Sequence, residues 1–151
     1  MASRDIAAEL ENPLEETLGY HVQRAADAAQ EAATHALARL DLRLISAVVM
    51  QLIEANHGCN QSSIARALGV QRTNLVPVMV DLEGRGLICR QPADGRSNAL
   101  SLTEAGKRLL SEANAVLKAI DAACYGDIPP RLRNRMVQHL RAVRQNAAAN
   151  S

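Results

Sequence analysis

Residues 62–87, SSIARALGVQRTNLVPVMVDLEGRGL, contain two helical patterns separated by the dipeptide Gly69-Val70. A helix, a short turn with glycine and a second helix make the helix-turn-helix plan, whose second helix enters the major groove of DNA. The second pattern begins with polar side chains, whose amide, guanidinium and hydroxyl groups suit base edges and phosphates. These are Gln71, Arg72, Thr73 and Asn74. The opposite face is apolar and is predicted to hold the helix to a core through Leu75, Val78, Met79 and Leu82.

Pro77 interrupts the second helical pattern. Because proline has no N–H, it removes the hydrogen bond to the carbonyl of Thr73, which costs about 3 kcal/mol in a helix interior. We expect Pro77 to lie inside the helix, with the freed carbonyl near solvent or DNA and the ring available to a thymine methyl group. The alternative is that the helix simply begins at Pro77.

The composition predicts one mainly helical domain. The chain has 151 residues, 48% of them apolar, and lacks Phe and Trp, so its core must be built from Leu, Val, Ile and Ala. The net charge of +1 neither requires nor excludes a nucleic-acid partner. Residues 1–20 hold five acids, whereas residues 131–144 hold five arginines. This complementarity suggests ion pairing within or between subunits.

The remaining patterns predict four more helices and a two-stranded ribbon. Residues 13–40 have the periodicity of one long helix with an alanine-rich stripe, and residues 41–56 are apolar nearly all round, as in a buried central helix. The helix over 61–68 has Asn60 as its N-cap. Residues 87–90 and 98–102 are strand-like.

Two helices are predicted after the ribbon. Thr103 is expected to cap a long one, and Pro130 to open the last one. In the last helix the apolar residues are expected to face inward, namely Leu132, Met136, Val137, Leu140 and Val143. The tail over 145–151 is expected to be frayed.

No apolar run reaches the roughly 18 residues of a membrane span, and the acidic amino terminus is unlike a signal peptide. Three widely spaced cysteines, an odd number, argue against a secreted disulfide framework. We therefore expect a cytoplasmic protein with no membrane partner.

Four stretches give the chain a family resemblance: LGYHVQRA, QLIEANHGCNQSSIARALGVQRTNLV, LEGRGLICR and DGRSNALSLTEAGKRLL. They resemble the MarR (multiple-antibiotic-resistance-regulator) family of winged-helix transcription factors, from about Leu18 to Val143. The family's wing motif is Asp-x-Arg followed by Leu-Thr-x-x-Gly. Here it is met by Asp94, Arg96, Leu102, Thr103 and Gly106.

The resemblance implies a mainly α fold with a small β-wing. It implies a single MarR-type domain over 1–151, with dimerisation helices at 13–40 and 104–146 and a winged helix-turn-helix lobe at 42–102. The partners implied are a second copy of the chain and a pseudo-palindromic operator in double-stranded DNA. Arg96 would enter the minor groove, oriented by Asp94. Gly95 stands where an arginine is common, which predicts a weaker grip by the wing.

The candidate DNA contacts come from both helices of the motif and from the wing. They are Gln61, Ser62, Gln71, Arg72, Thr73, Asn74, Val76, Pro77, Asp94 and Arg96. Arg66 and Arg90 are either phosphate contacts or ordinary surface charges.

A small anionic, aromatic effector is expected to release the DNA, such as an aromatic carboxylate or its thioester. The candidate residues combine cationic and hydrogen-bonding groups with an alanine where relatives often carry a ring. They are Tyr20, His21, Arg24, Arg43, Ser46 and Ala47. The alternative interpretation is dimer packing together with surface charge.

Two other functions stay open: a regulator switched by thiol oxidation, and a winged-helix interaction module without ligand control. His57 and Cys59 lack an orienting third group, so they do not predict a nucleophile. Cysteines and histidines show no ligand spacing, and no cofactor motif is present. We therefore expect neither a metal site nor an enzyme.

Overall fold

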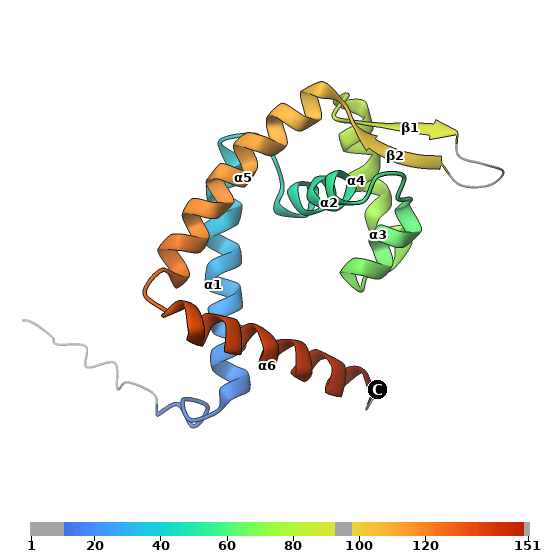
Figure 1. The fold of residues 1–151 in the computed structure, drawn as a ribbon. Helices are drawn as coiled ribbons and strands as arrows, with labels where there is room; N and C mark the ends of the chain where they lie inside the picture. Colours follow the sequence, from blue (N-terminus) through green and yellow to red (C-terminus); the bar gives the residue numbers. More distant parts are fainter. Residues whose placement is uncertain (1–10, 93–97, 150–151) are drawn as a thin grey trace, which may run out of the picture.

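The computed structural model describes residues 11–92 and 98–149. The elements in this part of the chain are α1 (Leu18–Ala38), α2 (Leu44–Ala55), α3 (Gln61–Leu68), α4 (Arg72–Gly84), β1 (Ile88–Pro92), β2 (Asn98–Leu102), α5 (Glu104–Tyr125) and α6 (Pro130–Ala149). α1 and α5 pack side by side as a helical arm, as Figure 1 shows. A lobe of α2, α3, α4 and the β-ribbon lies at one end of the arm, and α6 leaves the other end. The predicted mainly α fold with a small β-wing is confirmed.

The lobe is built around α2, as its apolar sequence predicted. Residues buried on α2 join one continuous aliphatic core with the inner face of α4, the ribbon and the start of α5. The predicted inner residues of α4 are all buried: Leu75, Val78, Met79 and Leu82. Burying one such side chain stabilises the fold by about 1.5–3 kcal/mol.

Local hydrogen bonds and one glycine determine where α3 begins and ends before the turn of the helix-turn-helix. Asn60 caps α3 by accepting a hydrogen bond from the Ser63 N–H, and the Ser63 hydroxyl accepts one from the Asn60 N–H. Gly69 ends α3 in the left-handed region at φ 67°, where a side chain is disfavoured. The Val70 N–H then bonds back to the Ala65 carbonyl, which closes the turn before α4.

The ribbon is an antiparallel pair in which Ile88 lies opposite Leu102 and Arg90 opposite Leu100. The Leu100 N–H also donates to the Cys59 carbonyl at 2.8 Å, which ties β2 to the segment between α2 and α3. Cys59 therefore supports the ribbon without belonging to either strand.

The Leu-Thr-x-x-Gly motif joins the ribbon to α5. The Thr103 hydroxyl donates to the Gly86 carbonyl at 2.6 Å and accepts from the Gly106 N–H at 3.0 Å. Gly106 is buried, and a Cβ there would lie 2.0 Å from the Leu87 carbonyl oxygen. Thr103 thus caps α5 as predicted, and Gly106 provides the space in which the two chain segments meet.

Both ends of the helical region differ from the prediction. α1 begins at Leu18 rather than near residue 13, because residues 13–16 form a turn in which the Asn12 side chain accepts from the Leu14 N–H. α6 continues through Ala149, so most of the tail expected to be frayed is helical. Three consecutive alanines with high helix propensity, Ala147, Ala148 and Ala149, account for this extension.

The apolar face of α6 is not inward within the subunit, contrary to the prediction. No residue of α6 is buried, and its five apolar side chains are 41–55% exposed: Leu132, Met136, Val137, Leu140 and Val143. Arg133 holds the helix start by donating to the carbonyls of Tyr125 and Ile128, so this arginine serves the α5–α6 turn. The apolar stripe of α6 is therefore exposed on the subunit.

We expect Gly106→Ala to destabilise the protein by several kcal/mol, since the new methyl group would collide with the Leu87 carbonyl. Gly84→Ala is the matched control, because a Cβ added there would meet no atom within 4 Å and its φ is not positive. It should leave stability unchanged or raise it by up to about 1 kcal/mol through helix propensity. Thermal and urea unfolding would measure both. Equal stability of the two variants would contradict the proposed close approach.

Candidate nucleic-acid interface

The amino-terminal end of α4 presents polar groups to solvent. Gln71, Arg72, Thr73 and Asn74 are exposed, and the Gln71 side chain makes no capping bond to the helix. The first turn contains no acidic residue. The helix dipole therefore adds positive potential to the Arg72 charge, which favours a phosphate at this end. The predicted set at the helix start is brought together on one surface.

Gln61 has a different place from the one predicted. Its side chain is buried, and Nε2 donates to the Arg72 carbonyl at 3.2 Å. It therefore links the start of α3 to the start of α4 and is directed to the backbone of α4 rather than to solvent. Its neighbour Ser62 is exposed at the start of α3 and stays a candidate for a phosphate contact.

Pro77 lies inside α4, five residues after its start, so the alternative that the helix begins there is wrong. Pro77 and Val76 are both exposed. Their side chains are on the solvent side of a helix whose opposite face is in the core.

Arginine pairs neutralise the acids of α4. Arg90 on β1 forms an ion pair with Glu83, and Arg85 lies 3.7 Å from an Asp81 carboxylate oxygen. These pairs lower the repulsion that the two carboxylates would exert on a DNA backbone. Arg90 is thus engaged within the subunit, whereas Arg66 on α3 is exposed. Asp94 and Arg96, the predicted wing contacts, lie outside the described residues.

The predicted effector residues form two separate groups. Tyr20, His21 and Arg24 are near the start of α1, where the Tyr20 and His21 rings meet edge to face at 5.3 Å. Arg43, Ser46 and Ala47 are at the start of α2, beyond the other end of α1. A helix rises about 1.5 Å per residue, so Tyr20 and Ala38 are roughly 27 Å apart. One subunit does not bring the six residues into one crevice.

The second group is mostly core. Ser46 and Ala47 are fully buried, so the small side chain of Ala47 is packed rather than open to a ligand. A phenylalanine at position 47 would overpack this core. The Ser46 hydroxyl is buried and has no hydrogen-bond partner among the described residues. An unpaired buried hydroxyl costs about 1–3 kcal/mol, which makes Ser46 the member of the group that needs an explanation.

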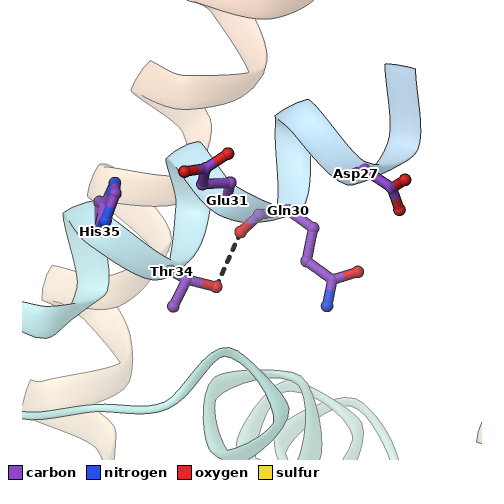
Figure 2. Close-up of a pocket in the computed structure, with 5 residues that line it drawn as sticks. All are labelled: Asp27, Gln30, Glu31, Thr34 and His35. Carbon is purple, nitrogen blue, oxygen red and sulfur yellow. Dashed lines mark hydrogen bonds between the residues drawn. The ribbon is translucent and has the colours of Figure 1, made fainter. Parts of the chain in front are cut away.

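Two surface depressions were not anticipated from the sequence. One, of about 290 Å³, lies along α1 and is lined by Asp27, Gln30, Glu31, Thr34 and His35 (Figure 2). Its two carboxylates make it unsuitable for an anionic effector. The other, of about 350 Å³, lies between α2 and α3 and is lined by Leu52, Asn56, His57, Gly58, Cys59, Ser63, Ile64 and Ala67.

The cysteines do not have the surroundings of a reactive thiolate. Burial raises the pKa of the Cys59 thiol, which lowers its thiolate fraction at neutral pH. Cys89 shares a hydrogen bond of 3.1 Å with the Ser101 hydroxyl, and Cys124 is exposed. Within residues 11–92 and 98–149, no three His, Cys, Asp or Glu side chains are grouped as metal ligands. None of the helices in these ranges is both long enough and apolar enough to cross a membrane.

No family model matches the chain. The chain is 32% identical over 117 residues to a transcriptional regulatory protein for the hcr operon of Thauera aromatica, covering 73% of this chain and 68% of that protein. It is similar to the structure of a MarR-family transcriptional regulator from Rhodococcus sp. RHA1, with 28% identity, a TM-score of 0.80 and coverage of 88% and 96% of the two chains.

Two structures of the transcriptional repressor CouR, one with DNA and one with a small molecule, are also similar to this chain. Its structure bound to a 23-mer DNA duplex matches with 34% identity, a TM-score of 0.80 and coverage of 90% of this chain and 99% of that one. Its structure bound to p-coumaroyl-CoA matches with 31% identity, a TM-score of 0.78 and coverage of 89% and 97%.

We expect Gln61→Ala to weaken DNA binding without changing which base is preferred at any position. The variant loses the hydrogen bond that holds the start of α4, which should lower the free energy of unfolding by about 1 kcal/mol. Urea unfolding and fluorescence anisotropy with a selected duplex and its single-base variants would measure both effects. Ser62→Ala is the control for an exposed neighbour and should not change stability. A changed preference at one base in Gln61→Ala would show direct readout instead.

Proposed function

The chain belongs to the MarR family of transcriptional regulators, and from this premise we propose that it binds a pseudo-palindromic operator as a homodimer. We further propose that a small anionic aromatic effector releases it from that operator. In this proposal the protein is a repressor and has no catalytic role.

The exposed polar residues at the start of α4 are the main support for DNA binding. Arg72, Thr73 and Asn74 project from a helix whose other face is anchored in the core, which is the arrangement that a recognition helix needs. In the proposal Arg72 and Ser62 contact phosphates, while Asn74 reads a base edge in the major groove. Gln71 and Thr73 flank it, and Arg96 of the wing enters the minor groove beside Asp94.

The homodimer is supported by the uncovered apolar surface at the far end of the arm. Besides the stripe of α6, exposed apolar residues lie on and before the start of α1, namely Leu14, Leu18 and Val22. Burying such surface in a two-fold interface would set two copies of α4 in successive major grooves. The operator would then have half-sites about 10–10.5 bp apart, centre to centre.

The proposed effector class is supported by an exposed arginine at the start of α2 and by the ligand of a similar protein. CouR binds p-coumaroyl-CoA, an aromatic acyl thioester with anionic phosphates. In this chain we propose Ser46 as a hydrogen-bonding group for the effector, because its hydroxyl is buried and has no hydrogen-bond partner among the residues that the structure describes. Arg43 is the N-cap residue of the same helix and is exposed, so it can meet an anionic group. Tyr20, His21 and Arg24 would join this site only if the partner subunit brought them to it.

Regulation by thiol oxidation is disfavoured at Cys59 and Cys89, since burial raises the pKa of Cys59 and a hydrogen bond engages Cys89. The interaction module without ligand control would show no effector response in the experiments below.

The operator proposal predicts two kinds of loss at three positions. Arg96→Ala should weaken binding to all duplexes and flatten the dependence of log Kd on log salt, because phosphate and groove charge contacts release counterions. Arg72→Ala should do the same. Asn74→Ala should cost about 1–3 kcal/mol and relax preference at one base pair.

Selection from random duplexes would supply the operator, and anisotropy titrations at several salt concentrations would measure affinity. Arg108→Ala, at an exposed position on α5, is the charge-matched control and should bind normally. Absence of any sequence preference would contradict the proposed function.

The effector proposal predicts that Ser46→Ala raises the stability of the protein and weakens its response to the effector. Removal of the unpaired hydroxyl should raise the free energy of unfolding by about 1 kcal/mol or more. The same change should reduce operator release by p-coumaroyl-CoA several-fold, with operator affinity unchanged. Coenzyme A and p-coumarate are the comparison ligands, and Ser111→Ala, at an exposed position on α5, is the control variant. Normal release in Ser46→Ala would remove Ser46 from the effector site.

A further inference from the structure

The outer face of α4 is apolar, although it points away from the core. At 100° per residue, Thr73, Val76, Pro77 and Val80 share one face, opposite the buried residues of the helix. Val76 is 47% exposed and Val80 is 63% exposed. We call Val76, Pro77 and Val80 the outer apolar strip. It lies along the helix directly after the polar residues of the first turn.

The strip cannot read bases by hydrogen bonding. Valine and proline side chains have neither donors nor acceptors, and in the major groove the one apolar group on a base edge is the C5-methyl of thymine. The acids of α4 are paired with Arg85 and Arg90, so no unpaired carboxylate of this helix opposes a duplex beside the strip. From these features we propose that the outer apolar strip reads thymine methyl groups and makes the operator half-site thymine-dependent.

This inference rests on the proposed operator binding, and it specifies what the recognition helix selects. The strip is continuous with the polar start of α4, which carries the proposed phosphate and base-edge contacts. From Thr73 to Val80 the helix rises about 10 Å, which is about three base-pair steps of 3.4 Å. Arg72 and Asn74 project on either side of the strip, so methyl contacts and polar contacts would alternate across the same few base pairs.

Deoxyuridine tests the inference directly, because it lacks the C5-methyl of thymidine and keeps the same hydrogen-bonding edge. In the selected operator, each dT of a half-site is replaced in turn by dU, and Kd is measured at fixed salt. Replacement at a contacted thymine should weaken binding about four-fold, the value for losing burial of one methyl-sized group. Thymines outside the contacted base pairs should show no change.

Valine truncation then assigns the effect to the strip. In Val76→Ala and Val80→Ala the penalty for dU at the matching position should fall toward one-fold, because the methyl has lost its partner. Val70→Ala is the matched control: Val70 is an exposed valine in the turn before α4 and is not on the strip. Its dU penalty should equal that of the unchanged protein. Pro77→Ala should remain folded and lose part of the penalty.

The outcomes are distinguishable. A specific operator whose affinity is unchanged by dU at every thymine would overturn the inference and leave the proposed function standing. Loss of all sequence preference in the unchanged protein would overturn both. If Val76→Ala and Val80→Ala altered the oligomeric state by sedimentation and left the dU penalty intact, the strip would be a protein interface and the inference would be wrong.

Discussion

The placement of the DNA-binding lobe on the arm depends on the approach of the Leu87 carbonyl to the first turns of α5. A Cβ at position 106 would lie 2.0 Å from that oxygen, so only glycine permits the contact. The Thr103 hydroxyl bonds to both sides of the same point, through the Gly86 carbonyl and the Gly106 N–H. α4 ends at Gly84 and β1 begins at Ile88, and therefore this contact holds the end of α4, the ribbon and α5 together.

A second tie reaches the carboxyl-terminal end of α4 from the other helix of the arm. Arg85 donates to the Asp41 carbonyl at 2.8 Å, and Asp41 has a left-handed backbone with φ 49° between α1 and α2. The end of α4 is thus fixed to the segments that follow α1 and precede α5. A rearrangement of the arm that kept both contacts would therefore move the end of α4 with it. In the proposed function, these contacts would connect the effector contact at Ser46 to the spacing of two recognition helices.

Features that depend on contacts within a few residues were predicted correctly from the sequence. The surroundings of a side chain were not, where packing between distant segments determines them. The turn at Gly69, the Asn60 cap and the Thr103 cap depend on contacts within a few residues, and all three were predicted. Gln61 looked like a DNA contact because a polar residue at a helix start has the same pattern whether it faces DNA or a neighbouring carbonyl. Periodicity likewise showed that α6 has an apolar stripe without showing that the subunit leaves it uncovered.

The apolar residues of this chain fall into two sets. One set forms the core of the subunit, and the other is exposed on α4, α1 and α6. A continuous aliphatic core holds the lobe without using the outer face of α4 or the stripe of α6. Residues on those two surfaces can therefore change with little effect on the subunit's own core. In the proposed complex, each surface would remove apolar area from water only on binding its partner, a second subunit for α6 and the operator for α4. Because the proposed dimer would fix the spacing at which both copies of α4 meet DNA, burial at the first surface would be a condition for burial at the second.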